Sequence, residues 1–315
     1  MSNNQGQTEG QTEGQTQGQT QGQTRVVLGT ATPGGGFPLY GGVVAEAMGA
    51  VDPTLVVECR NTKGSTENVP LLEAGELDIA LVQGEVAHEA LNGIGRAPAK
   101  LLIIAAMYST AGMFVVRADS PYRSIADLRG KPVAFGAKGS GLVILSRNVL
   151  DGMGLDQNQD FQAIYLDKAG DGPAMVLDGR VAALWGGGVG WPGFTAVANG
   201  PVGARFITPD AGERARILAK HNFLKALTVA PGGYPGQDQA IDSVGSWSFI
   251  MARPTLPDAV AYQLARALHK SEPGLPAKLE QARETTAANT VAAVPTLDLI
   301  HPGARKYLRE IGLSA

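Results

Sequence analysis

The fold is decided by Gly29-Thr30-Ala31-Thr32-Pro33-Gly34-Gly35-Gly36-Phe37 and by Asn61-Thr62-Lys63-Gly64-Ser65-Thr66-Glu67-Asn68. Each stretch follows an apolar run that predicts a strand, at 26–28 and 55–57, and each precedes a segment that predicts a helix. Such a unit directs backbone N–H groups and the positive end of a helix dipole at one point. In open α/β sheets, pockets form beyond the carboxyl ends of the strands. Two adjacent units therefore predict a pocket for a small anion.

A third turn of this kind is Gly136-Ala137-Lys138-Gly139-Ser140-Gly141, which opens a further predicted helix. None of the three turns has a nucleotide-binding signature: Gly35 and Gly36 stand where a P-loop needs Lys and Ser or Thr. Ser140 is not in a nucleophile elbow, because Lys138 and Leu142 occupy its glycine positions. The alternative interpretation is that these are tight turns without a ligand.

Strand and helix patterns alternate along the chain and predict an α/β fold with a largely parallel sheet. The pattern restarts after residue 112 and returns to an apolar strand near 247–251. We therefore expect two lobes joined by two crossing strands, near 112–116 and 244–249, with a ligand cleft between the lobes. Residues 25–112 and 247–315 are predicted to form lobe 1, and residues 113–246 lobe 2.

The first 24 residues repeat Gly-Gln-Thr-Glu and Gly-Gln-Thr-Gln, and we predict that they form a disordered tail. Of the 29 acidic residues only Glu9 and Glu13 lie in this tail, so the body is nearly neutral beside 26 basic residues. That balance argues against a nucleic-acid partner. The chain has no apolar run of 18 residues that would predict a transmembrane helix, and its start lacks the pattern of a signal peptide.

No combination of residues predicts catalysis, a metal site or a cofactor. The four histidines lack metal-binding spacing and are expected in surface or capping roles. The single cysteine, Cys59, alternates with Leu55 and Val57, which predicts a small buried residue. Trp185 and Trp191 flank a glycine-rich loop, and Tyr234 lies in another. These aromatics are either a lid over a ligand or packed side chains beneath their loops.

The order of these motifs resembles that of the TAXI solute-binding subunits of TRAP transporters. The resemblance starts with 28–36, 62–65, Asn68 and the segment Gly75-Glu76-Leu77-Asp78, and it continues through 82–85 and 124–131. It ends with 136–141, Tyr234-Pro235-Gly236-Gln237 and His301-Pro302-Gly303-Ala304. Together these segments cover nearly all of residues 25–315.

The resemblance implies a type II periplasmic-binding-protein fold, a periplasmic location and delivery of a small solute, an organic acid or an amino acid, to a TRAP-type permease. No enzymatic activity, cofactor or nucleic-acid partner is expected, and the protein is expected to be monomeric. The start of the chain departs from this family, and a genuine start there would imply a cytoplasmic protein. The residues that the resemblance places at the ligand are Thr30, Gly35, Gly36, Phe37, Thr62, Gly64, Ser65, Gln83, Ser140, Gly141, Trp185 and Tyr234.

Two alternatives remain open from the sequence. An enzyme on the same two-lobe scaffold is one, because a fold does not fix a function; His88 and His221 are its only candidates, without motif support. A cytosolic sensor that kept the pocket and lost the transporter is the other.

Overall fold

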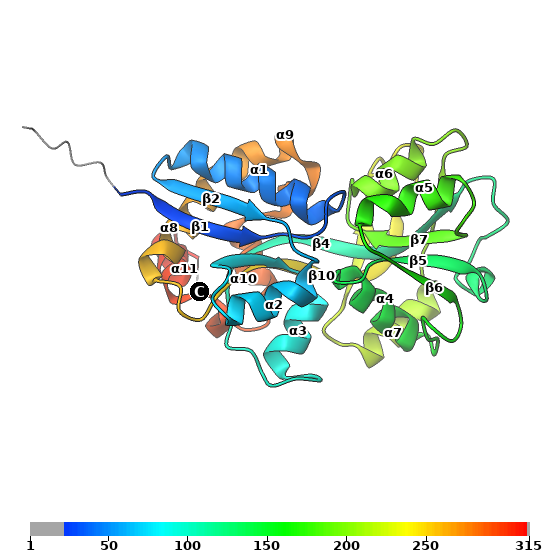
Figure 1. Cartoon of the computed structure of the whole chain (residues 1–315), viewed down its shortest axis with the longest axis horizontal. Helices are drawn as coiled ribbons and strands as arrows, with labels where there is room; N and C mark the ends of the chain where they lie inside the picture. The colour runs from blue at the N-terminus through cyan, green and yellow to red at the C-terminus, as the bar shows by residue number, and fades with distance from the viewer. Residues whose placement is uncertain (1–21, 314–315) are drawn as a thin grey trace, which may run out of the picture.

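The computed structural model describes residues 22–313, which form an α/β fold of two lobes (Figure 1). In lobe 1, three strands alternate with three helices, as the sequence predicts. These elements are β1 (Thr24–Gly29), α1 (Gly36–Val51), β2 (Leu55–Arg60), α2 (Ser65–Glu73), β3 (Ile79–Val82) and α3 (Gly84–Asn92). Strand β1 lies between β2 and β3 and pairs in parallel with both. The carboxyl ends of β1 and β2 therefore lie at one edge, where the first two glycine-rich turns follow them.

Lobe 2 repeats this theme with shorter elements. Its elements are β5 (Pro132–Ala137), α4 (Gly141–Gly152), β6 (Gln162–Leu166), α5 (Gly172–Leu177), β7 (Ala183–Gly187), α6 (Pro192–Ala198), β8 (Ala204–Ile207), α7 (Ala211–Lys220) and β9 (Lys225–Val229). Strand β5 pairs in parallel with β6 and β7. In Figure 1, helices α5 and α6 lie above these strands and α4 and α7 lie below them.

Two long strands, β4 (Leu102–Arg117) and β10 (Ile241–Ala252), connect the lobes. They exchange partners along their length. Strand β4 pairs with β10 in lobe 1 and with β7 and β8 in lobe 2, whereas β10 pairs with β9 in lobe 2 and with β3 in lobe 1. The continuous sheet order is β2-β1-β3-β10-β4-β7-β5-β6. The predicted domain boundaries, 112/113 and 246/247, fall inside these two strands. The division of the chain into lobe 1 and lobe 2 at these boundaries stays a prediction.

The strands cross where Gly245 lies opposite Ala111. A Cβ atom on residue 245 would lie 1.7 Å from the carbonyl oxygen of Thr110, so the backbones approach too closely for any side chain. Glycine at this position therefore allows the two lobes to share one sheet.

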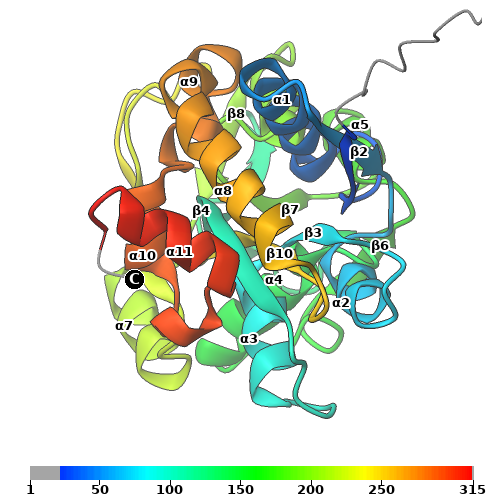
Figure 2. The same ribbon diagram turned by 90° about the vertical axis from the view of Figure 1, so that its left-hand side faces the viewer.

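The chain returns to lobe 1 after β10 and covers it with helices (Figure 2). These are α8 (Asp258–Ser271), α9 (Leu275–Lys278), α10 (Ala287–Ala293) and α11 (Pro302–Glu310). Short 3₁₀ turns occupy Ala126–Leu128, Ala169–Asp171, Glu272–Gly274, Glu280–Glu284 and Leu297–Leu299. Helix α8 buries Leu264 and Leu268 in a lobe 1 core with Leu28 and Tyr40. A separate core in lobe 2 forms around Phe114 and Trp185.

Two predictions need correction or restriction. The predicted disordered tail falls largely on residues 1–21, outside the described residues, but its last residue, Thr24, is the first of β1 and pairs with Leu55. Cys59 is exposed rather than buried. Strand β2 is at the edge of the sheet, and its last three residues are exposed, so alternation does not bury this position.

None of the described helices is both long enough and apolar enough to span a membrane.

Candidate functional site

A cavity of about 50 Å³ lies between the lobes, where the glycine-rich turns of lobe 1 face the third turn in lobe 2. Eight of the twelve residues predicted at the ligand line it: Gly35, Gly36, Phe37, Gly64, Ser65, Gln83, Ser140 and Gly141. The remaining lining residues are Ala31, Thr32, Lys63, Tyr108, Thr110, Ala137, Leu142, Ala169, Gly187 and Trp191. Because both lobes contribute, the cavity exists only while they are in contact.

The lobe 1 side is built from the first turns of α1 and α2. The residues before these helices, Gly35 and Gly64, have no side chain to cap them. The first N–H groups of a helix have no partner within the helix, so they are the groups that can meet a ligand at these two ends. In α2, however, the Thr66 N–H already donates to the Gly139 carbonyl and the Glu67 N–H to the Gly64 carbonyl. Both helix dipoles also place partial positive charge there. An anion is the ligand that such an arrangement favours.

The lobe 2 side contributes a helix end that is already capped. The Ser140 hydroxyl accepts a hydrogen bond from Leu142 N at 3.2 Å. Gly141, which begins α4, packs directly against lobe 1: a Cβ atom there would lie 2.5 Å from the Cβ of Gln83 and 3.1 Å from the Ser65 hydroxyl. Glycine at this position therefore lets α4 reach the opposite lobe.

Hydrogen bonds across the cleft hold the lobes together beside the cavity. Both the backbone N–H and the hydroxyl of Thr66 donate to the Gly139 carbonyl, at 3.2 and 3.0 Å. Ala169 N donates to the Thr32 hydroxyl at 3.2 Å. Gly64 has a φ of +121°, and a Cβ there would lie 2.7 Å from the Gly139 carbonyl oxygen. The structure therefore represents a closed arrangement of the two lobes.

Two buried polar side chains stand out on the lobe 1 side. Gln83 is 3% exposed and lines the cavity, and its side-chain nitrogen makes no hydrogen bond. Glu85 is fully buried, and neither of its carboxyl oxygens makes one. Burial raises the pKa of Glu85 to about 7; Ser246 and Gln83 lie near enough to offset part of that rise, although not in normal hydrogen-bond geometry. Unsatisfied buried polar groups are rare in folded proteins and call for an explanation.

Thr30 and Thr62, both predicted at the ligand, do not line the cavity. The Thr30 carbonyl accepts hydrogen bonds from Asn68 Nδ2 at 2.8 Å and from the Thr62 hydroxyl at 3.1 Å. Asn68 also donates to the Leu81 carbonyl at 2.8 Å. These side chains therefore tie the two glycine-rich turns to each other and to β3, behind the cavity surface.

Trp185 and Tyr234, both predicted to cover the ligand, also lie behind the surface. Trp185 is fully buried and donates through Nε1 to the Leu142 carbonyl at 2.9 Å, which supports the first turn of α4. The Tyr234 hydroxyl donates to the Gly188 carbonyl and accepts from Trp191 N at 3.4 Å. Burial raises the pKa of Tyr234, so its hydroxyl keeps its proton. Tyr234 thus holds the loop that carries Trp191.

Tyr108 and Thr110 line the cavity but were not predicted there, and Trp191, which also lines it, was predicted only as an aromatic that forms either a lid or a packed side chain. Tyr108 and Thr110 project from β4 at the crossing point, and Tyr108 packs edge-on against Tyr40 with ring centres 5.2 Å apart. Burial raises the pKa of Tyr108, which therefore offers a neutral hydroxyl. The sequence signal for Trp191 was its place after a glycine-rich loop, but Trp185 shares that signal.

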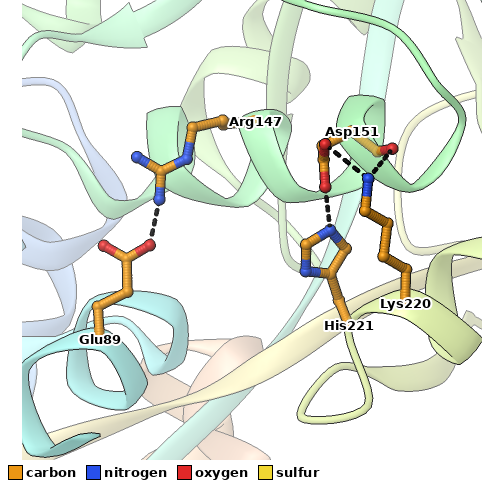
Figure 3. Close-up of polar contacts among 5 residues, drawn as sticks. All are labelled: Glu89, Arg147, Asp151, Lys220 and His221. Atoms are coloured by element: carbon orange, nitrogen blue, oxygen red, sulfur yellow. Dashed lines mark hydrogen bonds and ion pairs between the residues drawn. The ribbon is translucent and has the colours of Figure 1, made fainter. Parts of the chain in front are cut away.

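A second hollow, of about 540 Å³, lies along α4 and the end of α7. Two of its charged side chains pair with each other: Asp151 accepts from Lys220 at 2.8 Å, and it also accepts from His221 at 2.7 Å (Figure 3). The Lys220 ammonium group, followed by His221, lowers the pKa of Asp151. Arg147 of α4 pairs with Glu89 of α3 and so bridges the lobes. Because Arg147, Asp151 and Lys220 already have partners, the smaller interlobe cavity is the better candidate site.

The histidines take structural positions. His301 is 2% exposed, accepts from Gly303 N at 3.2 Å and caps α11. His88 stacks on Phe223 with ring centres 4.1 Å apart. Within residues 22–313, no three His, Cys, Asp or Glu side chains come together as a metal ion would require.

Several solved structures share this two-lobe fold. The periplasmic aliphatic sulphonate binding protein SsuA of Escherichia coli aligns over 90% of this chain and 78% of its own, with a TM-score of 0.50 and 18% identity. Malate-bound MatC of Rhodopseudomonas palustris aligns over 91% and 97%, with a TM-score of 0.59 and 12% identity. A structure described as a periplasmic transporter aligns over 93% and 94%, with a TM-score of 0.57 and 16% identity.

At these sequence identities the structural likeness shows the fold alone. The evidence for the family of this chain comes from its sequence. The profile of the NMT1-like family matches residues 28–312, from the end of β1 to just beyond α11. Since this match includes both lobes and both crossing strands, the chain belongs to the NMT1-like family.

Proposed function

We propose that the protein is a solute-binding receptor that captures a small carboxylate-bearing molecule between its lobes and delivers it to a membrane permease. The observation that carries this proposal is the convergence of the first turns of α1, α2 and α4 on one interlobe cavity. Partial positive charge and free N–H groups at helix ends suit a carboxylate. The two lobes meet only through β4 and β10 and their contacts across the cleft, an arrangement that suits closure around a ligand.

We further propose that the protein is a TAXI-type subunit, that it acts in the periplasm and that its partner is a TRAP-type permease. The order of motifs along residues 25–315 supports this assignment. The functional lining is proposed to comprise the eight predicted residues at the cavity together with Tyr108, Thr110 and Trp191. Thr30, Thr62, Trp185 and Tyr234 are proposed to position that lining rather than touch the solute.

Native mass spectrometry of the purified full chain tests the receptor function. We expect a fraction of the protein to carry one small acid, which is released and identified after denaturation. The identified acid, added back at about 100 times its Kd, is expected to stabilise the protein by about 2.7 kcal/mol in a thermal unfolding experiment. An empty protein that no organic acid stabilises would contradict the receptor proposal.

A further inference from the structure

The chemistry of the cavity lining indicates how many charges the solute carries. Among the described residues of the lining, Lys63 is the one charged residue. Its side chain is 77% exposed, and its ammonium group lies 3.8 Å from a carboxylate oxygen of Glu67. The cation therefore faces solvent at the rim and already has a partner. Inside the cavity, the positive potential comes from helix ends, which each carry about half an elementary charge.

The remaining polar side chains are neutral hydrogen-bonding groups. Gln83 lines the cavity, and its buried amide nitrogen makes no hydrogen bond. The Tyr108 hydroxyl and Trp191 Nε1 both lie beside Gly36, 3.5 and 3.6 Å from where a Cβ atom of that residue would be. A buried donor left without an acceptor costs about 1–3 kcal/mol, so a ligand that offers acceptors here recovers that energy. One carboxylate supplies acceptors for several of these groups at once.

The rest of the lining is apolar. Phe37 and Ala31 contribute from lobe 1, and Ala137, Leu142 and Ala169 contribute from lobe 2. Burying an unpaired charge against such a surface is costly. Glu85 follows Gln83 closely in the chain, but it is fully buried and does not line the cavity. An ammonium group on the solute would therefore find no carboxylate among the described residues of the lining, only neutral hydroxyl and amide groups and apolar carbons.

We propose that the cavity selects a solute with one negative charge on an apolar body, so that a monocarboxylate binds better than a dicarboxylate or an α-amino acid. This inference rests on the proposed receptor function and narrows the class of solute. Lobe 1 holds the carboxylate against the uncapped ends of α1 and α2 and the Gln83 amide. Lobe 2 covers the apolar remainder with Leu142 and Trp191.

Calorimetric titration of the full chain with matched acids tests the selectivity. The four-carbon set is butanoate, succinate and 2-aminobutanoate, and the five-carbon set is pentanoate, glutarate and norvaline. In each set the second compound has a carboxylate in place of the terminal methyl group, and the third has an ammonium group in place of one hydrogen on the carbon next to the carboxylate. We expect the monocarboxylate to bind at least about tenfold more tightly than the dicarboxylate or the amino acid of its set, which corresponds to 1.4 kcal/mol in binding free energy.

Other outcomes separate this inference from the proposed function. Equal or tighter binding of a dicarboxylate or an amino acid would overturn the selectivity while the receptor function stands. If none of the six acids binds, the acid released in native mass spectrometry decides: a monoanion supports the inference, and a dianion or zwitterion overturns it. No binding and no released acid would overturn both proposals.

Replacement of Gln83 tests the proposed donor. Gln83→Leu removes the unpartnered amide and keeps an apolar side chain of similar size, so the protein is expected to remain at least as stable. We expect its affinity for the bound monocarboxylate to fall at least about tenfold. The control is Gln263→Leu, which removes an amide from α8, outside the cavity lining, and is expected to leave affinity unchanged. Unchanged affinity in Gln83→Leu would contradict the role of this amide.

Discussion

The two sides of the interlobe cavity are built on the same strand–turn–helix plan but leave their helix ends in different states. On the lobe 1 side, α1 and α2 begin without side-chain caps, and Gln83 and Glu85 have unsatisfied polar atoms. On the lobe 2 side, Ser140 caps α4, Trp185 braces its first turn and Tyr234 braces the loop before Trp191. The lobe 1 side of the cavity therefore offers unused hydrogen-bonding capacity, whereas on the lobe 2 side the helix end is capped and its supporting aromatic side chains are hydrogen-bonded.

This difference predicts different roles for the two lobes in binding a solute. Unsatisfied donors bind a solute, so lobe 1 is expected to make the first contact with it. A rigid, satisfied surface is suited to closing over a ligand, so lobe 2 is expected to act as the cover. Substitutions in lobe 2 are then expected to change the free energy of unfolding or the closure of the lobes. Substitutions on the lobe 1 side are expected to change solute affinity or the free-energy cost of its unpaired polar groups.

The largest expected effect is on the packing of lobe 2. Trp185→Ala removes a fully buried ring that packs edge-on against Phe114, with centres 4.7 Å apart, and the hydrogen bond to Leu142. We expect the free energy of unfolding to fall by about 3–5 kcal/mol, measured by urea unfolding. Leu39→Ala, at an exposed site on α1, is expected to change it by less than about 0.5 kcal/mol. Equal effects would contradict a central packing role for Trp185.

The next effect concerns the unpaired carboxyl group of lobe 1. Burial raises the pKa of Glu85 in the folded protein from 4.5 to about 7, so its contribution to stability is full below pH 4.5 and is lost as pH rises through 7. Glu85→Gln cannot ionise. We expect the variant to gain stability relative to the original protein between pH 4.5 and 7, by roughly 3 kcal/mol in total.

Urea unfolding of both proteins at pH 5, 6, 7 and 8 measures this difference. Glu76→Gln, at a side chain that is 54% exposed, is the control and is expected to show no comparable change with pH. A constant difference between Glu85→Gln and the original protein at all four values would show that Glu85 does not titrate in this range.

A smaller effect is expected where lobe 2 touches lobe 1. Gly141→Ala places a methyl group within 2.5 Å of the Gln83 Cβ, so α4 must retreat from the cavity. We expect solute affinity to fall about tenfold, or 1.4 kcal/mol, in calorimetry with the acid identified for this protein. Gly42→Ala meets no atom within 4 Å and stabilises α1 through helix propensity, with affinity unchanged. Full affinity in Gly141→Ala would show that contact at this point is not needed for binding.

The smallest effect is expected for the ion pair that links the lobes through α3 and α4. The side chains of Arg147 and Glu89 are 49% and 24% exposed, and pairs of this kind contribute about 0–1 kcal/mol. Arg147→Met should lower the free energy of unfolding by less than about 1 kcal/mol, and the loss should shrink at 1 M salt. A loss of several kcal/mol that persists in salt would identify this pair as a principal clamp between the lobes.

The fold was predictable because each glycine-rich turn carries its own local signal. The apolar runs at 26–28 and 55–57 lie within β1 and β2, and α1 and α2 begin inside the two glycine-rich stretches that were predicted to precede helices. Strand β9 (Lys225–Val229) was missed, since it is short and mostly exposed and pairs with β10 alone. Apolar periodicity does not reveal a strand of that kind.

The site was predictable where backbone supplies the chemistry and less so where side chains do. Trp185 and Trp191 flank the same glycine-rich loop, but β7 places the first in the core, and the turns at Gly188 and Gly190, both with positive φ, carry the second to the cavity. Tyr108 and Thr110 lie in an almost continuous apolar strand, which does not distinguish a core face from a cavity face. Only the crossing of β4 and β10 brings them to the interlobe cavity.

The exchange of partners by β4 and β10 also constrains the order in which the molecule assembles during synthesis. Lobe 2 lies between these strands as one continuous stretch of chain. Lobe 1 lacks the strand between β3 and β4 until residues 241–252 have been made, and the helices that cover it come later still. Pairings so distant in sequence form slowly. We therefore expect the amide hydrogens of lobe 2 to become protected first during refolding and those of lobe 1 to become protected last. Pulsed hydrogen exchange measures this order. Earlier protection in lobe 1 would refute it.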